Sequence, residues 1–491
     1  MRHVLPHAAF FGLVALLASM VPSGFLGEPE VRTAVVVVGV LGAWRYSWAT
    51  INFTRAAIFR GLVYPRWRRE REARFAAEPR PSHCFFMVTT YLVDEDTTLM
   101  VYRTVFRAAA AARDGATVVA SVVDGKDARL IRAVFETMPI DMGGVRLVID
   151  RIAAAGKRDA MGKAMRILAA MAPSDRDITV FVDGDTCVPE DIWARAAPVF
   201  TDPTVGALTT DEAAIIDREG LYKDWFTLRF DQRQVMMCSM GLSNRVLTLT
   251  GRMSVFRASL VTDPGMIAGV ERDYLDHWRL GRVDFLTGDD KSTWYWLLSR
   301  GYKTAYLPDV RSASVETQPR DTFLDSAQTL MTRWFGNMMR TNGRALRLGV
   351  RRMGPFTWWS ILDQRVSMFT TLVGPISVAI AALAGKPEAI PLYVAWVLFT
   401  RYVFCAYIAL FRGTWFPVTH PPILYFGQVA GALVKTFVFF RLDRQKWTRQ
   451  GSGAAAALTG MQRLRRFEST AMHALALGWL TVAILFVNSV E

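Results

Sequence analysis

Long apolar runs lie at both ends of the 491-residue chain, and a central stretch of ordinary polarity separates them. A run of about 20 residues can cross the roughly 30 Å hydrocarbon core of a membrane as a helix. The runs of this length cover residues 8–27, 33–52, 366–385, 391–411, 422–440 and 472–489. Charged residues still make up 21% of the chain, which argues against a wholly membrane-embedded protein. We expect a multi-pass membrane protein with a polar domain inserted between its helices.

The two N-terminal runs predict a transmembrane helical hairpin, which forms a first unit at residues 1–76 together with its basic exit. Seven arginines lie between Arg55 and Arg74, after the second run, whereas the loop between the runs holds a single arginine. Arginine-rich flanks stay in the cytoplasm, so we expect the central block there. A secretory signal is the alternative for the first run, but no clean cleavage site precedes the second.

The topology of the C-terminal region, residues 366–491, depends on a basic loop at 441–468. This loop holds seven Lys or Arg residues. If all four C-terminal runs crossed the membrane, the loop would lie outside, against the charge rule. We therefore favour a re-entrant or interfacial position for the run at 422–440, which leaves five spans and an outside C-terminus. Six spans remain the alternative.

The central block, residues 77–318, has the pattern of an α/β domain. Short β-branched runs alternate with Ala- and Arg-rich helical stretches, which is typical of a Rossmann-like, doubly wound, mostly parallel sheet. The five clearest strand runs are CFFMVTTYL, ATVVASVVD, VRLVID, ITVFVDGD and VGALTT. Residues 319–365 then interleave six arginines, from Arg333 to Arg352, with tryptophans. That pattern predicts amphipathic helices at the membrane surface.

Two acidic pairs stand at the ends of predicted elements. Asp183 and Asp185 flank Gly184 directly after an apolar strand, where two carboxylates suit a hard divalent cation that also binds substrate phosphates. The simpler alternative is a polar turn. Asp289 and Asp290 open a predicted helix. A helix N-cap would explain one of them, whereas a pair can have a raised pKa that suits a general base.

Three further motifs are weaker by themselves. Asp124 ends a predicted strand, and Lys157 and Arg158 precede or open a helix, where cations beside a helix N-terminus can cradle phosphate. A solvated basic helix face is the alternative. Gly251 and Arg252 interrupt a β-rich run and would let the backbone approach a ligand closely.

The overall charge narrows the class of partner. The net charge of +14 favours anionic partners such as lipid head groups, nucleotide phosphates, nucleic acid or an acidic polymer. The four cysteines lie far apart without CxxC spacing, which argues against a disulfide framework or a zinc module.

In their order along the chain, these motifs resemble the processive family 2 glycosyltransferases that make cellulose, chitin and hyaluronan. The ordered motifs are Asp124, Asp183-Gly-Asp185, Gly251-Arg252, Asp289-Asp290 and Arg333-Trp334. The segments VLTLTGRMSVFRAS, DHWRLGRVDFLTGDDKSTWY and FRLDRQKWTRQ are similar, more specifically, to the catalytic subunits of bacterial alginate polymerases, the mannuronan synthases. One position departs from the wider family, because Leu330 stands where Gln usually precedes Arg-Trp.

The resemblance implies a GT-A fold with a mixed sheet and an inverting transfer of mannuronate from GDP-mannuronic acid to a growing β-1,4-linked polymannuronate. It implies that Asp124 helps to hold the nucleotide and that Asp183 and Asp185 hold Mg²⁺ or Mn²⁺ on its diphosphate. Asp290 would be the base that deprotonates the acceptor hydroxyl, with Asp289 as its nearest competitor.

The remaining implied roles concern phosphate, acceptor and partners. Lys157, Arg158 and Arg333 would neutralise phosphate charge, Gly251 and Arg252 would lie near the acceptor, and Trp334 would stack on the acceptor sugar. The family implies a site in the bacterial inner membrane, a PilZ-domain co-polymerase that binds cyclic di-GMP, and periplasmic and outer-membrane export proteins. It implies the lipid bilayer as surroundings and no nucleic acid as partner.

Two other classes of function remain as alternatives. A synthase that uses a UDP-sugar to make a cellulose-, chitin- or hyaluronan-like polymer would carry similar motifs. A membrane transporter or scaffold would not explain four carboxylates at strand and helix ends. These carboxylates of the polar block therefore favour an enzyme over a transporter or scaffold.

Arg401 lies in the middle of the apolar run at 391–411. A charge near the bilayer centre costs at least about 2.5 to 3.5 kcal/mol on insertion scales, so such a residue usually faces a polar cavity. We predict that Arg401 lines the path of the polymer and pairs with its carboxylates. Lys435 lies nearer the end of its run and can equally well extend to the interface.

Overall fold

The computed structural model describes residues 4–78, 80–154, 156–284, 286–445 and 460–489. Its polar domain is built on an eight-stranded sheet in the order β3-β2-β1-β4-β7-β6-β10-β5. The strands are β1 (Cys84–Thr90), β2 (Ala116–Val122), β3 (Val145–Arg151), β4 (Ile178–Asp183), β5 (Thr186–Cys187), β6 (Val205–Ile215), β7 (Met253–Arg257) and β10 (Lys303–Val315). A separate hairpin pairs β8 (Leu275–His277) with β9 (Gly281–Val283).

The first half of the sheet is parallel, as the alternating pattern predicts. Strand β1 lies between β2 and β4 and runs parallel to both. Helices α4 (Glu95–Ala110) and α5 (Gly125–Glu136) connect β1 to β2 and β2 to β3. The chain then returns through α6 (Lys157–Ala170) to β4 on the other side of β1. Because such crossovers are right-handed, this reversal places α6 on the opposite face from α4 and α5.

The sheet is mostly parallel, as expected, and its second half contains the two reversed strands. Strand β7 runs antiparallel to both β4 and β6, and β5 runs antiparallel to β10. The sheet is therefore mixed, which the resemblance implies and the strand pattern alone does not, because alternating burial carries no information on strand direction. Three further helices complete this half: α8 (Leu221–Gly241), α10 (Pro264–Glu271) and α11 (Asp289–Arg300). Short helical segments lie at α7 (Ile192–Ala196), η3 (Ala197–Thr201) and α9 (Ala258–Val261).

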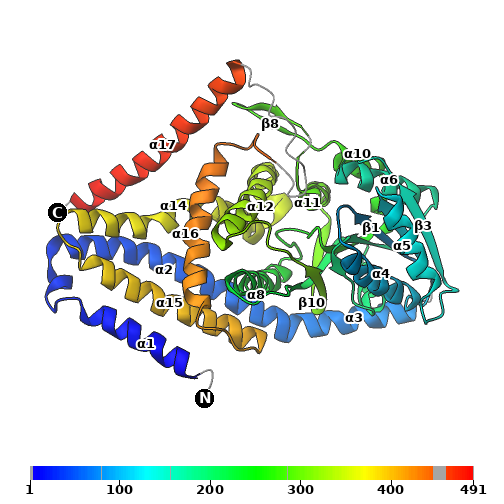
Figure 1. The fold of residues 1–491 in the computed structure, drawn as a ribbon, viewed down its shortest axis with the longest axis horizontal. Helices are drawn as coiled ribbons and strands as arrows, with labels where there is room; N and C mark the ends of the chain where they lie inside the picture. Colours follow the sequence, from blue (N-terminus) through cyan, green and yellow to red (C-terminus); the bar gives the residue numbers. More distant parts are fainter. Residues whose placement is uncertain (1–3, 79, 155, 285, 446–459, 490–491) are drawn as a thin grey trace.

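Most of the remaining helices lie to one side of the sheet domain, and α3 (Tyr64–Ala77) runs beneath it (Figure 1). They are α1 (Val4–Ser19), α2 (Pro29–Ile58), α3 (Tyr64–Ala77), α12 (Phe323–Leu346), α13 (Gly349–Met353), α14 (Pro355–Leu383), α15 (Ala389–Arg412), α16 (His420–Phe439) and α17 (Gly460–Ser489). Among the described residues, α14, α15, α16 and α17 are long and apolar enough to cross a membrane. The middle of the basic loop, residues 446–459, lies outside the described residues.

The N-terminal helices differ in detail from the predicted hairpin. Helix α1 ends at Ser19 rather than near residue 27, because Pro22 disfavours a helical conformation at the residue before it. At 16 residues, α1 is about 24 Å long, shorter than the hydrocarbon core. It packs mainly on α15, whereas α2 packs on α8. Helix α2 continues through the π-helical turn η2 (Phe59–Val63) into α3, beneath the sheet domain (Figure 1).

Helix α16 runs across the direction that α2, α14 and α15 share (Figure 1). It contacts α12, α14, α15 and α8. Two glycines allow the close approach, because a Cβ at Gly431 would lie 3.4 Å from the Phe335 ring and one at Gly427 would lie 3.9 Å from Trp225 Nε1. This direction favours an interfacial or re-entrant α16, although its length and composition also fit a span. Neither α1 nor α2 is among the described helices that are long and apolar enough to span, so the five spans counted from the sequence stay a prediction.

Candidate active site

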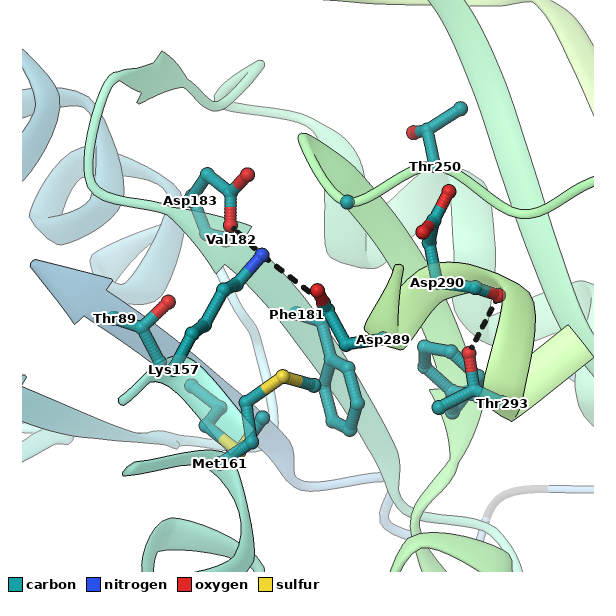
Figure 2. A pocket seen from close by; sticks show the side chains of 13 residues that line it. Thr89, Lys157, Met161, Phe181, Val182, Asp183, Thr250, Asp289, Asp290 and Thr293 are labelled. Carbon is teal, nitrogen blue, oxygen red and sulfur yellow. Dashed lines mark hydrogen bonds and ion pairs between the residues drawn. The ribbon is translucent and has the colours of Figure 1, made fainter. Parts of the chain in front are cut away.

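A pocket opens at the carboxyl ends of β1 and β4, where α6, the segment before β7 and the first turn of α11 converge (Figure 2). The pocket brings together residues that lie far apart in the sequence, from β1 near the start of the domain to α11 near its end. The lining residues are Met87, Thr89, Lys157, Met161, Phe181, Val182, Asp183, Thr250, Gly251, Phe256, Asp289, Asp290 and Thr293.

Lys157 joins the two predicted acidic pairs. Its Nζ lies 2.6 Å from Asp183 Oδ1 and 3.0 Å from Asp289 Oδ2 (Figure 2). Burial alone would lower the pKa of Lys157, but the charges of the two carboxylates outweigh burial and hold that pKa above its ordinary value. The lysine is therefore a firmly charged bridge between the end of β4 and the start of α11.

The Asp183-Gly184-Asp185 turn is held by the backbone. The Asp183 N–H donates to the carbonyl of Arg252 and the Gly184 N–H donates to the carbonyl of Thr89, each at 2.9 Å. A Cβ at residue 184 would lie 2.9 Å from both Thr89 O and Thr90 Cα, so only glycine fits without moving backbone. The turn thereby fixes the two aspartates that flank it.

The two aspartates of this turn have different surroundings. Burial raises the pKa of Asp183 to about 7, and the charge of Lys157 works against that rise. Asp185 is half-buried, and its carbonyl accepts a hydrogen bond from the Val315 N–H at 2.8 Å. Among the described residues no group of three or more His, Cys, Asp or Glu side chains could hold a metal ion. Any metal here would need ligands from substrate or water as well.

Asp289 and Asp290 share the first turn of α11 but face different neighbours. The N-cap is Gly288, with φ +91°, and neither aspartate caps the helix. Burial would raise the pKa of Asp289, but the charges of Lys157 and Arg158 outweigh it and lower that pKa. Burial and the charge of Asp289 raise the pKa of Asp290. The Asp290 carboxylate points away from Lys157, towards Thr250 (Figure 2).

Gly251 reaches the pocket, whereas Asp124 does not line it. A Cβ at Gly251 would lie 3.5 Å from both Asp183 Oδ2 and Lys157 Nζ, so this backbone closes one side of the ion pair. Asp124 is exposed after β2 and accepts a hydrogen bond from the Lys126 N–H at 2.9 Å as the N-cap of α5. It shares the sheet edge with Asp183 without lining the pocket.

Two predicted cations are used inside the protein. Arg158 is 4% exposed, and its guanidinium donates to the carbonyls of Leu286 and Val270 and, at 2.8 Å, to Ser292 Oγ. This differs from the predicted phosphate contact, because the side chain leaves the first turn of α6 on the face buried against α10 and α11. Arg252 likewise turns away from the pocket and donates from Nε to Glu316 Oε1 at 2.8 Å.

Arg333 and Trp334 lie on α12, and neither is among the residues that line the pocket. Burial lowers the pKa of Arg333, and the charges of Glu316, Asp183 and Asp290 partly offset that effect. The Trp334 ring stacks on Trp225, with ring centroids 5.6 Å apart. Leu330, at the position of the usual Gln, is 5% exposed and packs in the same apolar cluster.

The structure adds residues that the sequence reasoning missed. Thr250 lines the pocket opposite Asp290 (Figure 2). Burial lowers the pKa of Lys291 to about 8, and its Nζ donates to the carbonyl of Leu247 at 3.2 Å. Lys291 directly follows the Asp289-Asp290 pair, so the sequence could have indicated it as a residue of the site. Arg229 on α8 lies with its Cζ 4.0 Å from the Trp334 ring centroid, and no local sequence pattern connects these two residues.

The family model described as "Glycosyltransferase like family 2" matches residues 81–337 of this chain. The chain belongs to the family 2 glycosyltransferases. The match starts just before β1 and ends within α12, so it contains both acidic pairs, Lys157 and the Arg333-Trp334 motif. The predicted glycosyltransferase activity and GT-A type fold are therefore confirmed at the level of the family, and four apolar helices follow the catalytic sheet.

Two relatives of this family 2 glycosyltransferase match along nearly its full length. One, the glycosyltransferase alg8 of Pseudomonas syringae pv. tomato, is 40% identical over 99% of both chains. Another, the glycosyltransferase alg8 of Azotobacter vinelandii, is 41% identical over 94% of both chains. These full-length matches bear out the predicted resemblance.

A solved structure is also similar to this chain. It is a mannosyltransferase from Pyrobaculum calidifontis in complex with GDP-Man and Mn²⁺, with 21% identity and a TM-score of 0.45. The match covers 79% of this chain and 98% of that protein.

Proposed function

We propose that this glycosyltransferase is a mannuronan synthase, which transfers mannuronate from GDP-mannuronic acid to a growing β-1,4-linked polymannuronate with inversion. The full-length similarity to two alg8 glycosyltransferases supports the donor and polymer class. The observation that carries the proposal at the site is the Lys157 bridge, which holds Asp183 and Asp289 in one pocket beside Asp290. One pocket thus holds groups for the leaving diphosphate and for the attacking hydroxyl.

We assign the base to Asp290. A single displacement needs the acceptor hydroxyl to attack the anomeric carbon on the face opposite the diphosphate. As the new C–O bond forms, the hydroxyl proton passes to the base and GDP leaves with the electron pair of the broken bond. Asp290 suits this role because its carboxylate points into the pocket away from Lys157 (Figure 2), whereas that of Asp289 is ion-paired.

A divalent cation fits the Asp183-Gly-Asp185 turn. Two carboxylates flank one glycine at a strand end, and Mg²⁺ and Mn²⁺ commonly complete their oxygen shell with substrate phosphates and water. Asp183 and Asp185 would hold this ion. When bound, it would stabilise the negative charge of the leaving diphosphate.

Other residues of the chain complete the proposed site. Lys157 lies beside Asp183, so its ammonium would also face the donor diphosphate. Arg333 would supply a second positive charge from α12, Asp124 would contact the nucleotide at the sheet edge, and Trp334 would stack on the acceptor sugar. We infer a positioning role for Arg158, which ties α6 to the start of α11 through Ser292.

The proposed function also concerns where the protein lies in the membrane and how an acidic polymer would cross it. We infer an inner-membrane protein with its catalytic domain on the cytoplasmic side, because the arginines after the second apolar run favour that side. A polymer with one carboxylate per sugar cannot cross hydrocarbon unpaired, so cations are expected along its path. A PilZ-domain co-polymerase that binds cyclic di-GMP and periplasmic and outer-membrane export proteins belong to this proposal as partners.

The donor preference tests the proposed function directly. Membranes that contain this chain and its co-polymerase are incubated with radiolabelled GDP-mannuronate, UDP-glucose, UDP-glucuronate or UDP-N-acetylglucosamine. We expect label in polymer from GDP-mannuronate alone, and none from membranes with Asp290→Asn. Preference for any UDP-sugar would replace the proposal with the UDP-dependent alternative.

A further inference from the structure

Helices α8 and α12 bring a guanidinium against the tryptophan of the Arg333-Trp334 motif. The Arg229 Cζ lies 4.0 Å from the Trp334 ring centroid and 5.4 Å from that of Trp225. The two indole rings stack on each other with an interplanar angle of 28°. The guanidinium therefore lies against an aromatic platform, the stacked rings of Trp225 and Trp334, beside the indole that is proposed to stack on the acceptor sugar.

Arg229 has no ion-pair partner among the described residues. The acidic side chains whose charges reach it are Glu316 and Glu212. Glu316 pairs with Arg252 at 2.5 Å, and Glu212 pairs with Arg233 at 3.3 Å. Burial and the charge of Arg252 lower the pKa of Arg229 to about 10, so the side chain is still a cation at neutral pH. Arg229 is half-buried and positively charged, and the charge of Arg252 repels it.

A second cation reaches this place from α16. The Nζ of Lys435 lies 4.8 Å from the centroid of the Phe335 ring, next to Trp334 in the sequence. The charge of Asp363 attracts Lys435 and the charge of Arg229 repels it, and within the described ranges Lys435 forms no ion pair. Lys435 follows Gly427 and Gly431 at intervals of four residues, so it shares the helix face that packs on α8 and α12.

Packing on aromatic rings does not explain two unpaired cations at one place. A cation–π contact contributes only about 0.5 to 2 kcal/mol, and two half-buried cations whose charges repel would both be stabilised by an anionic partner. The charges of Asp183 and Asp290 act on the neighbouring Arg333, so this turn of α12 is electrostatically coupled to the catalytic pocket. An anionic group from the product is the partner that would complete it.

We propose that Arg229 and Lys435 form a carboxylate-binding subsite for the product chain beside Trp334, which makes the enzyme selective for an acidic polymer. This inference rests on the proposed function. A sugar ring stacks on the indole while its carboxylate accepts charge-assisted hydrogen bonds from the guanidinium. A neutral polymer would leave both cations unpaired and would bind less well.

Acceptor discrimination tests the subsite. Membranes with wild type, Arg229→Gln, Lys435→Gln or Arg229→Lys receive GDP-mannuronate and either short oligomannuronates or the same oligomers with their carboxyl groups reduced to alcohols. GDP release gives kcat and KM for each acceptor. The matched control is Arg146→Gln, which removes an exposed arginine of β3.

We expect wild type to prefer the carboxylated acceptor and both glutamine variants to lose about tenfold of that preference through a higher acceptor KM. Arg229→Lys should retain an intermediate preference, and the control should match wild type. Affinity for GDP-mannuronate, measured by titration, should not change in any variant.

Unchanged discrimination in the glutamine variants would overturn the subsite. If Arg229→Gln does not accumulate in membranes, Arg229→Lys and Lys435→Gln decide the question by the same ratio. Failure of the proposed function would look different, because wild type itself would then prefer a UDP-sugar donor. A wild type that uses GDP-mannuronate without acceptor preference would contradict the subsite alone.

Discussion

Two adjacent aspartates at the start of α11 acquire opposite properties from their surroundings. Lys157 lies 3.0 Å from Asp289, and its charge helps to lower the pKa of that carboxyl. Partial burial and the neighbouring charge of Asp289 raise the pKa of Asp290. At the residue scale this separates a carboxylate that holds the lysine from one that can accept a proton.

Asp290→Asn should remove turnover while leaving donor binding intact, because the chemical step needs a base and donor affinity does not. Loss of a general base typically costs about 10² to 10⁴ in rate. GDP release measures turnover, and titration with GDP-mannuronate measures binding. If Asp289→Asn is inactive while Asp290→Asn turns over, the two roles must be exchanged.

The activity should fall as pH decreases through the raised pKa of Asp290, since the base is lost on protonation. Asp289→Asn removes a like charge, so it should lower the pKa of Asp290 and move the acidic limb of the kcat profile to lower pH. The measurement is residual kcat against pH in both proteins. If the acidic limb stays in place or moves to higher pH, this limb must be due to a group other than Asp290.

Asp183→Ala and Asp185→Ala should each abolish metal-dependent synthesis, because both carboxylates are needed to share one divalent ion with the diphosphate. Mn²⁺ binding followed by electron paramagnetic resonance should weaken in both, while insertion into membranes persists. Asp217→Ala, at an exposed position, is the control. Wild-type activity and Mn²⁺ binding in both variants would exclude the metal assignment.

At the element scale, the contact between β1 and β4 determines where the Asp183-Gly-Asp185 turn lies. Gly184→Ala would place a methyl group 2.9 Å from Thr89 O and Thr90 Cα. Backbone must then move, at a cost of about 1 to 3 kcal/mol, and both aspartates move with it. We expect lower thermal stability and loss of activity.

Gly144→Ala provides the comparison for this prediction, since a Cβ there meets nothing within 4 Å. It should keep activity and melting temperature close to those of wild type. Equal behaviour of the two variants would show that the turn tolerates a side chain.

At the scale of the whole molecule, one arginine connects three of the helices beside the catalytic domain. Arg401 on α15 donates to Gln428 Oε1 on α16 at 3.0 Å and to Tyr46 OH on α2 at 3.3 Å. It thus joins three helices, and both of these acceptors are neutral. The predicted role in pairing with polymer carboxylates stays a prediction.

Arg401→Leu should insert and bind donor normally but yield less or shorter polymer, because the positive charge along the proposed path is gone. Arg401→Lys should retain more function, since the charge remains. Polymer yield and length distribution measure the effect. Unchanged yield and length in Arg401→Leu would indicate that the arginine serves only to join α2, α15 and α16.

Local patterns in the sequence were sufficient for much of the catalytic half. The runs that form β1, β2, β3, β4 and β6 were recognised, because burial and β-branching are properties of neighbouring residues. The Asp183-Gly-Asp185 turn and the Asp289-Asp290 helix start were found for the same reason. The order of motifs along the chain indicated the family.

Tertiary structure alone decided the features that depend on distant residues. Lys157 bridges Asp183 and Asp289, and Arg158, its neighbour, points into the protein instead. The antiparallel direction of β7, the course of α16 across the other helices and the meeting of Arg229 with Trp334 also depend on packing. Periodicity records which residues are buried, but the free energy of contacts between remote elements determines what each buried side chain meets.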